Sequence, residues 1–162
     1  MSQDFFYGYA LNAVDGKSRL SIPADYRQVI QTRSGSKELR LATSRNAPCL
    51  LGYDTTHFSR LMADHEARFA NQVSRGRDKD ATATFGPVSP LTIDDAGRIV
   101  LPPVLKRLGK IASHVWFIAG GNYFECWNPW VYLADPDADA TVAEILRFEL
   151  EAKGLPLQEP IA

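Results

Sequence analysis

The sequence has little of what marks several large classes of protein. Its 162 residues include only two cysteines, Cys49 and Cys126, which excludes a disulfide-stabilised scaffold and predicts a reducing compartment, the cytoplasm. No apolar run approaches the ~20 residues of a membrane-spanning helix, so no membrane partner is expected. The N-terminus also lacks the basic start and apolar stretch of a secretory signal. These absences predict a soluble, folded protein.

Signatures of catalysis are missing as well. The chain contains no phosphate-binding loop, no dinucleotide fingerprint and no nucleophile elbow. Its three histidines show no metal-binding spacing with cysteine, and His65 falls on the apolar stripe of a predicted helix, where a packed side chain is expected. Both cysteines fall in apolar strands, where buried structural thiols are typical. We therefore expect no enzyme, no cofactor and no metal.

The net charge of −1 does not by itself indicate a nucleic-acid binder. The charges are unevenly distributed, because residues 135–162 hold seven acids and two bases. The remaining 134 residues carry 16 bases and 12 acids. A mildly basic body with an acidic tail is compatible with phosphate binding.

One nine-residue pattern occurs twice. Residues 15–23 read DGKSRLSIP and residues 94–102 read DDAGRIVLP, so matched positions are 79 residues apart. Each copy has an Asp, an Arg four positions later, a short alternating apolar run and a Pro. A repeat of this kind indicates one supersecondary unit used twice. Any surface that the pattern carries is therefore expected twice in each chain.

The residues around the first copy predict strands and helices in a definite order. An aromatic, β-prone stretch precedes the Asp15–Gly16 turn, and the alternation after the turn predicts the returning strand of a hairpin. Pro23 suits the first turn of a helix that ends before Gly35. Two strands at 38–43 and 49–53 and a helix from about residue 56 to residue 73 are expected to follow.

The second copy repeats this order after residues 74–84, a polar and poorly periodic stretch that predicts an exposed connector. A short helix is expected after Pro102, and another helix is expected to be capped by Asn128. The strands expected in this half are 88–93, 99–101, 115–119 and 123–127. A last helix, from about residue 139 to 153, has no counterpart in the first half.

The repeated turn places a guanidinium just beyond each hairpin tip. Asp15 and Asp94 suit tight turns, because an Asp carboxylate accepts hydrogen bonds from backbone amides two residues on. Arg19 and Arg98 can then project outward, and Lys17 adds a second cation to the first tip. A guanidinium donates a fork of hydrogen bonds that suits phosphate oxygens or the major-groove edge of guanine. The same Asp–Arg pair can also serve only to brace a hairpin, and the sequence leaves that alternative open.

The two motifs resemble the paired D-x-x-x-R motifs of the MraZ family, regulators of the bacterial division and cell-wall gene cluster. The resemblance covers roughly residues 5–150. It includes Tyr7-Gly8 near the start, Tyr26-Arg27 after the first Pro and an aromatic-rich second half. The family is related to AbrB-like proteins, in which two swapped β-hairpin units interlock and their loops form a DNA-binding face.

The resemblance implies a mainly β fold with peripheral α-helices (α+β), a pseudo-twofold AbrB-like swapped-hairpin barrel from two repeats on one chain. The first repeat would span residues 5–80 and the second residues 81–135, followed by a C-terminal helix and acidic tail at 136–162. The implied function is that of a sequence-specific transcriptional regulator, with repression as the expected mode. It would bind promoter direct repeats in double-stranded DNA as a ring-shaped homo-oligomer, in the cytoplasm at the nucleoid.

Carried over by position, the resemblance assigns DNA contact to Lys17, Arg19 and Arg98, and the shaping of the loops to Asp15 and Asp94. These five residues are the candidate site.

Two positions depart from the family pattern. Ser18 stands where the family usually has Gly before the Arg, which implies a less open turn. Ala96 stands where a basic or amide residue is common, so fewer positively charged side chains are expected near Arg98. The first tip is therefore expected to contribute more of the contact with DNA.

Two other functions remain open at the level of sequence. The aromatic strands and the C-terminal helix would also suit an oligomeric protein-interaction module. An AbrB-type antitoxin is a related possibility, although such proteins normally carry one hairpin unit. The dependence of binding on salt distinguishes these functions, because DNA binding weakens steeply as ionic strength rises and binding through an apolar protein interface does not.

Overall fold

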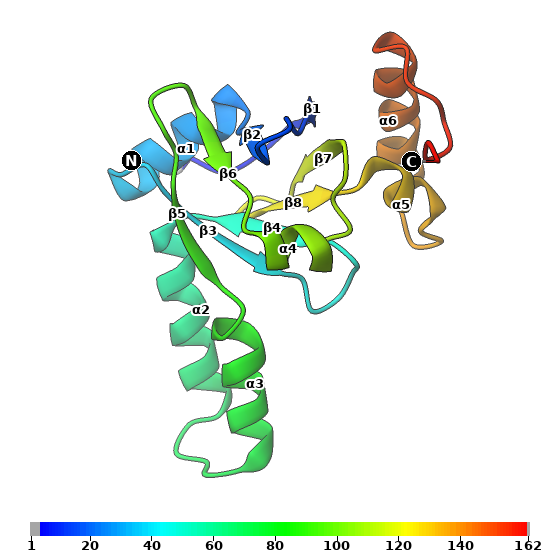
Figure 1. The fold of residues 1–162 in the computed structure, drawn as a ribbon. Helices are drawn as coiled ribbons and strands as arrows, with labels where there is room; N and C mark the ends of the chain where they lie inside the picture. The colour runs from blue at the N-terminus through cyan, green and yellow to red at the C-terminus, as the bar shows by residue number, and fades with distance from the viewer. Residues whose placement is uncertain (1–3, 162) are drawn as a thin grey trace.

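Between residues 4 and 161, the computed structural model has eight strands and six helices (Figure 1). The strands are β1 (Tyr9–Ala13), β2 (Arg19–Ser21), β3 (Glu38–Thr43), β4 (Leu50–Tyr53), β5 (Ser89–Thr92), β6 (Arg98–Val100), β7 (His114–Ala119) and β8 (Phe124–Trp127). The helices are α1 (Ala24–Ser34), α2 (Thr55–Arg68), α3 (Arg75–Phe85), α4 (Pro103–Leu108), α5 (Pro129–Ala134) and α6 (Ala140–Ala152).

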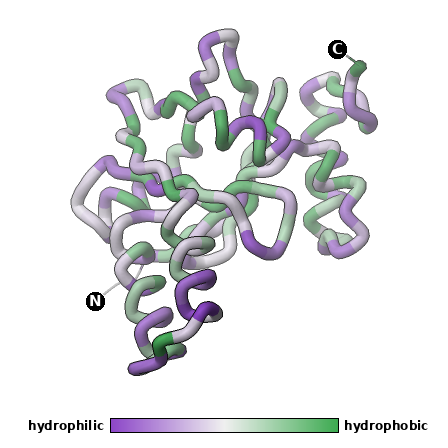
Figure 2. The backbone as a smooth tube through the Cα atoms, turned by 60° about the horizontal axis from the view of Figure 1, so that its bottom comes forward, coloured by the Kyte–Doolittle hydropathy of each residue, from purple (hydrophilic) through white to green (hydrophobic). Residues whose placement is uncertain are grey.

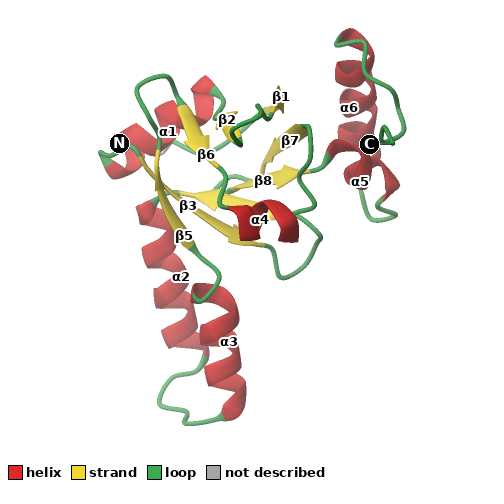
Figure 3. Cartoon of the chain, in the orientation of Figure 1, coloured by secondary structure: helices red, strands yellow, loops and turns green. Residues whose placement is uncertain are grey.

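The strands form two antiparallel sheets, so the fold is mixed α+β (Figure 3). The larger sheet has six strands in the order β1-β7-β8-β4-β3-β5, and β2 pairs with β6 in a separate two-stranded ribbon. The expected closed barrel is not formed by hydrogen-bonded strands within residues 4–161. The chain continues from β1 into β2 and from β5 into β6, and these two strands pair with each other instead of closing the larger sheet.

The strands on either side of each repeated turn do not form a simple hairpin, and that prediction was wrong. β1 pairs with β7 and β5 pairs with β3, whereas an isolated bridge between Val14 and Leu20 joins the two sides of the first turn. The physical reason is burial, because Leu20 and Ile99 face each other across the ribbon and are both buried in one core cluster. The two copies of the motif therefore meet in one ribbon.

Two apolar clusters pack on opposite faces of the larger sheet and join it to the surrounding helices and to the ribbon. Alternation along β7 separates them, since Phe117 lies in the larger cluster and Trp116 in the smaller one. The larger cluster also contains Leu20 and Ile99, which fixes the ribbon onto the sheet. The smaller cluster contains Leu146 of α6. Each fully buried large side chain contributes about 1.5–3 kcal/mol relative to leaving it exposed.

The predicted helix signals around the motifs are confirmed. α1 begins after Pro23 and ends at Gly35, which has the left-handed φ of 68° that favours glycine. α4 likewise begins after Pro102. Asn128 caps α5, because its Oδ1 accepts hydrogen bonds from the amides of Trp130 at 2.9 Å and Val131 at 3.2 Å. Pro23 and Pro102 therefore mark where each tip is followed by its helix.

Residues 74–84 are largely exposed, as expected, but they are not an irregular connector, because helix α3 begins at Arg75. Ser74 caps this helix by accepting a hydrogen bond from the Arg77 amide at 3.1 Å. α2 also ends at Arg68, before the expected Val73. The two helices form a hairpin that extends from the sheet (Figures 1 and 3), and the first turns of α3 are strongly hydrophilic (Figure 2).

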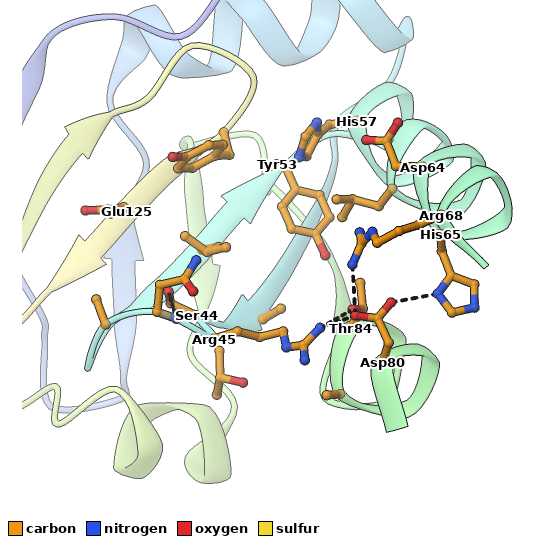
Figure 4. A pocket seen from close by; sticks show the side chains of 18 residues that line it. Ser44, Arg45, Tyr53, His57, Asp64, His65, Arg68, Asp80, Thr84 and Glu125 are labelled. Atoms are coloured by element: carbon orange, nitrogen blue, oxygen red, sulfur yellow. Dashed lines mark hydrogen bonds and ion pairs between the residues drawn. The ribbon is translucent and has the colours of Figure 1, made fainter. Parts of the chain in front are cut away.

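One buried carboxylate, Asp80, explains why this polar stretch folds against α2. Its Oδ2 lies 2.7 Å from His65 Nδ1, and its Oδ1 accepts hydrogen bonds from Arg45 at 2.6 Å and Arg68 at 3.2 Å (Figure 4). The Arg45 hydrogen bond is the largest cause that lowers the pKa of Asp80 to about 2. His65 is buried, as expected, and its ring packs edge-on against Phe85. Apolar periodicity could not reveal a helix held by polar groups.

Candidate nucleic-acid interface

The first tip, residues 15–19, is closed by the Asp15 side chain. Its Oδ1 accepts hydrogen bonds from the backbone amides of Lys17 at 2.9 Å and Arg19 at 2.8 Å. The backbone adds two bonds, from Ser18 N to Asp15 O at 3.0 Å and from Asp15 N to Arg19 O at 3.1 Å. An Asp at this position therefore determines the path of the turn.

The second tip, residues 94–98, uses the same set of bonds. Asp94 Oδ1 accepts hydrogen bonds from the backbone amides of Ala96 and Arg98, both at 2.9 Å. Gly97 N donates to Asp94 O and Asp94 N donates to Arg98 O, again both at 2.9 Å. The two copies of the motif thus have matching turns.

Each aspartate also orients its arginine. Arg19 Nε donates to Asp15 Oδ2 at 2.6 Å, whereas Arg98 Nε lies 3.5 Å from Asp94 Oδ2 without a hydrogen bond. Both arginine side chains are 35% exposed. No other residue between 4 and 161 hydrogen-bonds their terminal guanidinium nitrogens, so these donors are available for a ligand.

The turns keep both aspartates ionised. The backbone amide of Arg19 is the largest cause that lowers the pKa of Asp15, to about 2. The backbone amide of Arg98 has the same effect on the pKa of Asp94, which is also lowered. At neutral pH each tip therefore holds its arginine with a charged carboxylate.

The strand register places both arginines on one face of the ribbon. Arg19 lies opposite Val100, and Ser21 lies opposite Arg98, while Leu20 and Ile99 point to the other, buried face. Directly opposed residues of an antiparallel pair share a face, and diagonal neighbours are about 7–8 Å apart. Arg19 and Arg98 are such diagonal neighbours. We call the exposed side, formed by Arg19, Ser21, Arg98 and Val100, the ribbon face.

The backbone of each tip is tied to the segment that follows the other tip. Leu101 N donates to Ser18 O at 2.9 Å, and Ile22 N donates to Gly97 O at 2.9 Å. These reciprocal bonds join the two tips through the ribbon.

Two basic residues that sequence reasoning did not assign lie beside the tips. Lys106 Nζ of α4 donates to Ser18 Oγ at 3.2 Å. The Arg27 guanidinium of α1 lies against Gly97, where an added Cβ would be 2.7 Å from Arg27 Cζ. Arg27 and Lys106 occupy matching positions, four residues after the Pro of each motif. That spacing was the signal that could have found them.

Among residues 4–161 both thiols are buried, and the side chains that could ligate a metal are not clustered. Burial raises the pKa of Cys49 to about 12, and it also raises the pKa of Cys126 well above its ordinary value. No cluster of three or more His, Cys, Asp or Glu side chains among residues 4–161 could hold a metal ion. No helix in the same residues is long and apolar enough to span a membrane.

Comparison with known proteins identifies relatives over most of the chain. The chain is 37% identical over 118 residues to the transcriptional regulator MraZ of Azorhizobium caulinodans, which covers 72% of each protein. It is 30% identical over 145 residues to MraZ of Rickettsia akari, with 90% of this chain and 95% of that protein covered. MraZ of Gluconacetobacter diazotrophicus is 30% identical over 126 residues, or 76% of this chain and 78% of that protein.

The chain belongs to the MraZ family of transcriptional regulators. No family model matches the chain, so membership rests on these pairwise similarities. The family is one of regulators and not of enzymes. The MraZ resemblance predicted from the paired motifs is therefore confirmed.

Proposed function

We propose that the ribbon face binds double-stranded DNA and that the chain regulates transcription through this contact. The observation that carries the proposal is the position of Arg19 and Arg98, side by side on one exposed face with their terminal nitrogens uncommitted. Such guanidinium groups can reach phosphates or guanine edges. Lys17, on the first tip, would add a phosphate contact, and Asp15 and Asp94 would hold the loops in shape.

We further propose that residues 5–80 and 81–135 are two AbrB-like swapped-hairpin units related by a pseudo-twofold axis. The matching turns and the reciprocal bonds from Leu101 to Ser18 and from Ile22 to Gly97 support this relation. Residues 136–162, with α6 and the acidic tail, would be an accessory to these units. An axis through the ribbon would explain why β2 pairs with β6.

The assembly would be a ring of identical chains that meets promoter direct repeats. Exposed aromatic residues support an interface at the edge strand β1, because Phe5, Tyr7 and Tyr9 are 46%, 71% and 46% exposed. A ring multiplies weak contacts through effective concentration, which would offset the net charge of −1. By analogy with the family, the target is a bacterial division and cell-wall gene cluster, repressed at the nucleoid in the cytoplasm.

The same exposed aromatic residues also favour a second function, that of an oligomeric interaction module without DNA. The two functions differ in their response to salt. Binding through the ribbon face should weaken steeply between low and moderate ionic strength, whereas an apolar interface should not.

The direct test is a gel-shift titration of the double variant Arg19→Ala/Arg98→Ala on the upstream region of the gene's own operon. Each good bidentate contact contributes about 1–3 kcal/mol of discrimination, so we expect the loss of two contacts to lower the affinity by at least about 30-fold. Both side chains are partly exposed, so the variant should remain folded, which circular dichroism checks.

A matched control is Arg75→Ala/Arg147→Ala. It also removes two positive charges, from the exposed Arg75 of α3 and from Arg147 of α6, which is partly exposed and paired with Glu144 at 3.1 Å. This variant should bind as the unchanged protein does. Equal affinity for both double variants would overturn the assignment of the ribbon face.

A further inference from the structure

The two tips differ in charge when they are considered alone. The first tip holds Lys17 and Arg19 against one carboxylate, so it is positive. The second tip holds Asp94 and Asp95 against Arg98, so it is negative. A negative loop is a poor partner for a phosphate backbone. A positive charge that offsets the second tip must therefore come from another part of the chain.

Arg27 supplies such a charge to the second tip. Its guanidinium lies against Gly97, next to Arg98, and its Nε donates to Ile22 O at 3.1 Å. No carboxylate between residues 4 and 161 forms an ion pair with Arg27, whereas Lys37 is already paired with Asp95 at 3.1 Å. The side chain also lines an open hollow of about 320 Å³ between α1 and the second tip, together with Lys37, Asp94 and Asp95, so it is accessible from solvent.

Lys106 has the same role at the first tip. Its Nζ donates to Ser18 Oγ at 3.2 Å, which leaves two of its three donors available. No ion pair with a carboxylate involves Lys106 within the described part of the chain. The backbone explains the match, because Arg27 N bonds to Pro23 O and Lys106 N bonds to Pro102 O in the first turn of each helix.

We propose that Arg27 and Lys106 form two equivalent binding sites for backbone phosphates, one beside each tip. Each residue belongs to the half of the chain opposite to the tip that it contacts. Arg19 and Arg98 lie on the ribbon face, whereas Arg27 lies beside the second tip and Lys106 beside the first. Lys106 adds to the positive charge of the first tip, and Arg27 offsets the negative charge of the second tip. Contacts of this kind carry no base preference.

This proposal rests on the proposed function, and salt dependence tests both. Binding of the full chain is measured against salt on two duplexes, the operon's upstream region and a shuffled sequence of equal length. We expect Arg27→Gln and Lys106→Gln each to weaken binding about five- to tenfold on both duplexes. Each variant should also reduce the slope of log affinity against log salt by about 0.9, the value for one lost phosphate contact.

Three further variants distinguish a direct phosphate contact from a structural role at the tip and from a nonspecific effect of net charge. Arg27→Lys and Lys106→Arg keep the charge but change the contacts with the tip, so they should retain the slope. Arg107→Gln removes one charge from the neighbouring exposed position on α4 and should leave the slope unchanged.

The outcomes are distinguishable. An unchanged chain with no salt-dependent binding to either duplex would contradict the proposed function itself. Binding by the unchanged chain, with unaltered slopes in folded Arg27→Gln and Lys106→Gln, would overturn only the phosphate sites. A lower affinity with an unaltered slope would also overturn them, because Arg27 and Lys106 would then only position the tips.

Discussion

The two tips have the same backbone and different side chains. At the residue before the arginine, the backbone of both tips passes through the left-handed region, with φ of 61° at Ser18 and 82° at Gly97. Beside Ser18 lies the slender amine of Lys106, and beside Gly97 lies the broad guanidinium of Arg27. The Asp of each motif sets the turn. The space beside the turn is occupied by the Ser18 side chain in the first tip and by the Arg27 guanidinium of α1 in the second.

Making the second tip like the first should have the largest effect. In Gly97→Ser, a Cβ would lie 2.7 Å from Arg27 Cζ at a φ that L-residues rarely adopt. We expect a loss of about 2–3 kcal/mol in the free energy of unfolding, from the left-handed backbone and the displaced guanidinium. Chemical denaturation measures this loss.

The double variant Gly97→Ser/Arg27→Lys is the control for that prediction. It removes the bulk of the guanidinium, so it should recover part of the lost stability. If stability is not recovered, backbone strain alone explains the loss, and the steric conflict between the added Cβ and the Arg27 guanidinium contributes nothing.

Single arginine variants should separate the contributions of the tips to DNA binding. Arg19 is held by a hydrogen bond of 2.6 Å to Asp15, whereas Arg98 lies 3.5 Å from Asp94. A better-oriented donor loses less entropy on binding. We expect Arg19→Ala to weaken binding about 30-fold and Arg98→Ala about tenfold, within the range for one base contact. Gel-shift titration gives both values, and the reverse order would contradict the predicted dominance of the first tip.

Making the first tip like the second should have a smaller and opposite effect. Ser18→Gly relieves a left-handed residue, which costs about 1–2 kcal/mol, but it adds the backbone entropy of glycine, about 0.5–1 kcal/mol. We therefore expect the free energy of unfolding to rise by about 0.5 kcal/mol. A decrease would mean that the bond from Lys106 to Ser18 Oγ outweighs the strain.

The smallest difference should appear in acid. The pKa of Asp15 is lowered from 3.8 to about 2, so its contribution to stability is present above about pH 4 and is lost as the pH falls through 2. Asp15→Asn should therefore flatten the decline in Tm between pH 4 and 2. Asp94→Asn should flatten it less, because Arg98 does not hydrogen-bond Asp94. Equal pH profiles of Tm for the two variants would contradict this difference.

Much of the local structure could be predicted from sequence because its signals are local. Pro23, Gly35 and Asn128 fix helix ends through backbone geometry and capping, which any chain segment shows by itself. The motif spacing also predicted matching turns, and both turns have the expected Asp bonds to backbone amides.

Long-range features could not be predicted in the same way. The pairing of β2 with β6 depends on Leu20 and Ile99 meeting across the ribbon, about 80 residues apart in the chain. α3 depends on Asp80 gathering His65 and Arg45, a polar cluster without any apolar period. The same limit applies to the site, since Arg27 approaches the second tip only in the folded chain.

The central claim is that both tips approach one duplex from one face, and tethered cleavage tests it most directly. The two native thiols are buried, so a cleaving reagent can be attached selectively in Lys17→Cys or Ala96→Cys, with Arg147→Cys on α6 as the control. We expect DNA cuts from both tip variants, on the same side of the duplex, and none from the control. Cuts from only one tip, or from neither, would contradict it.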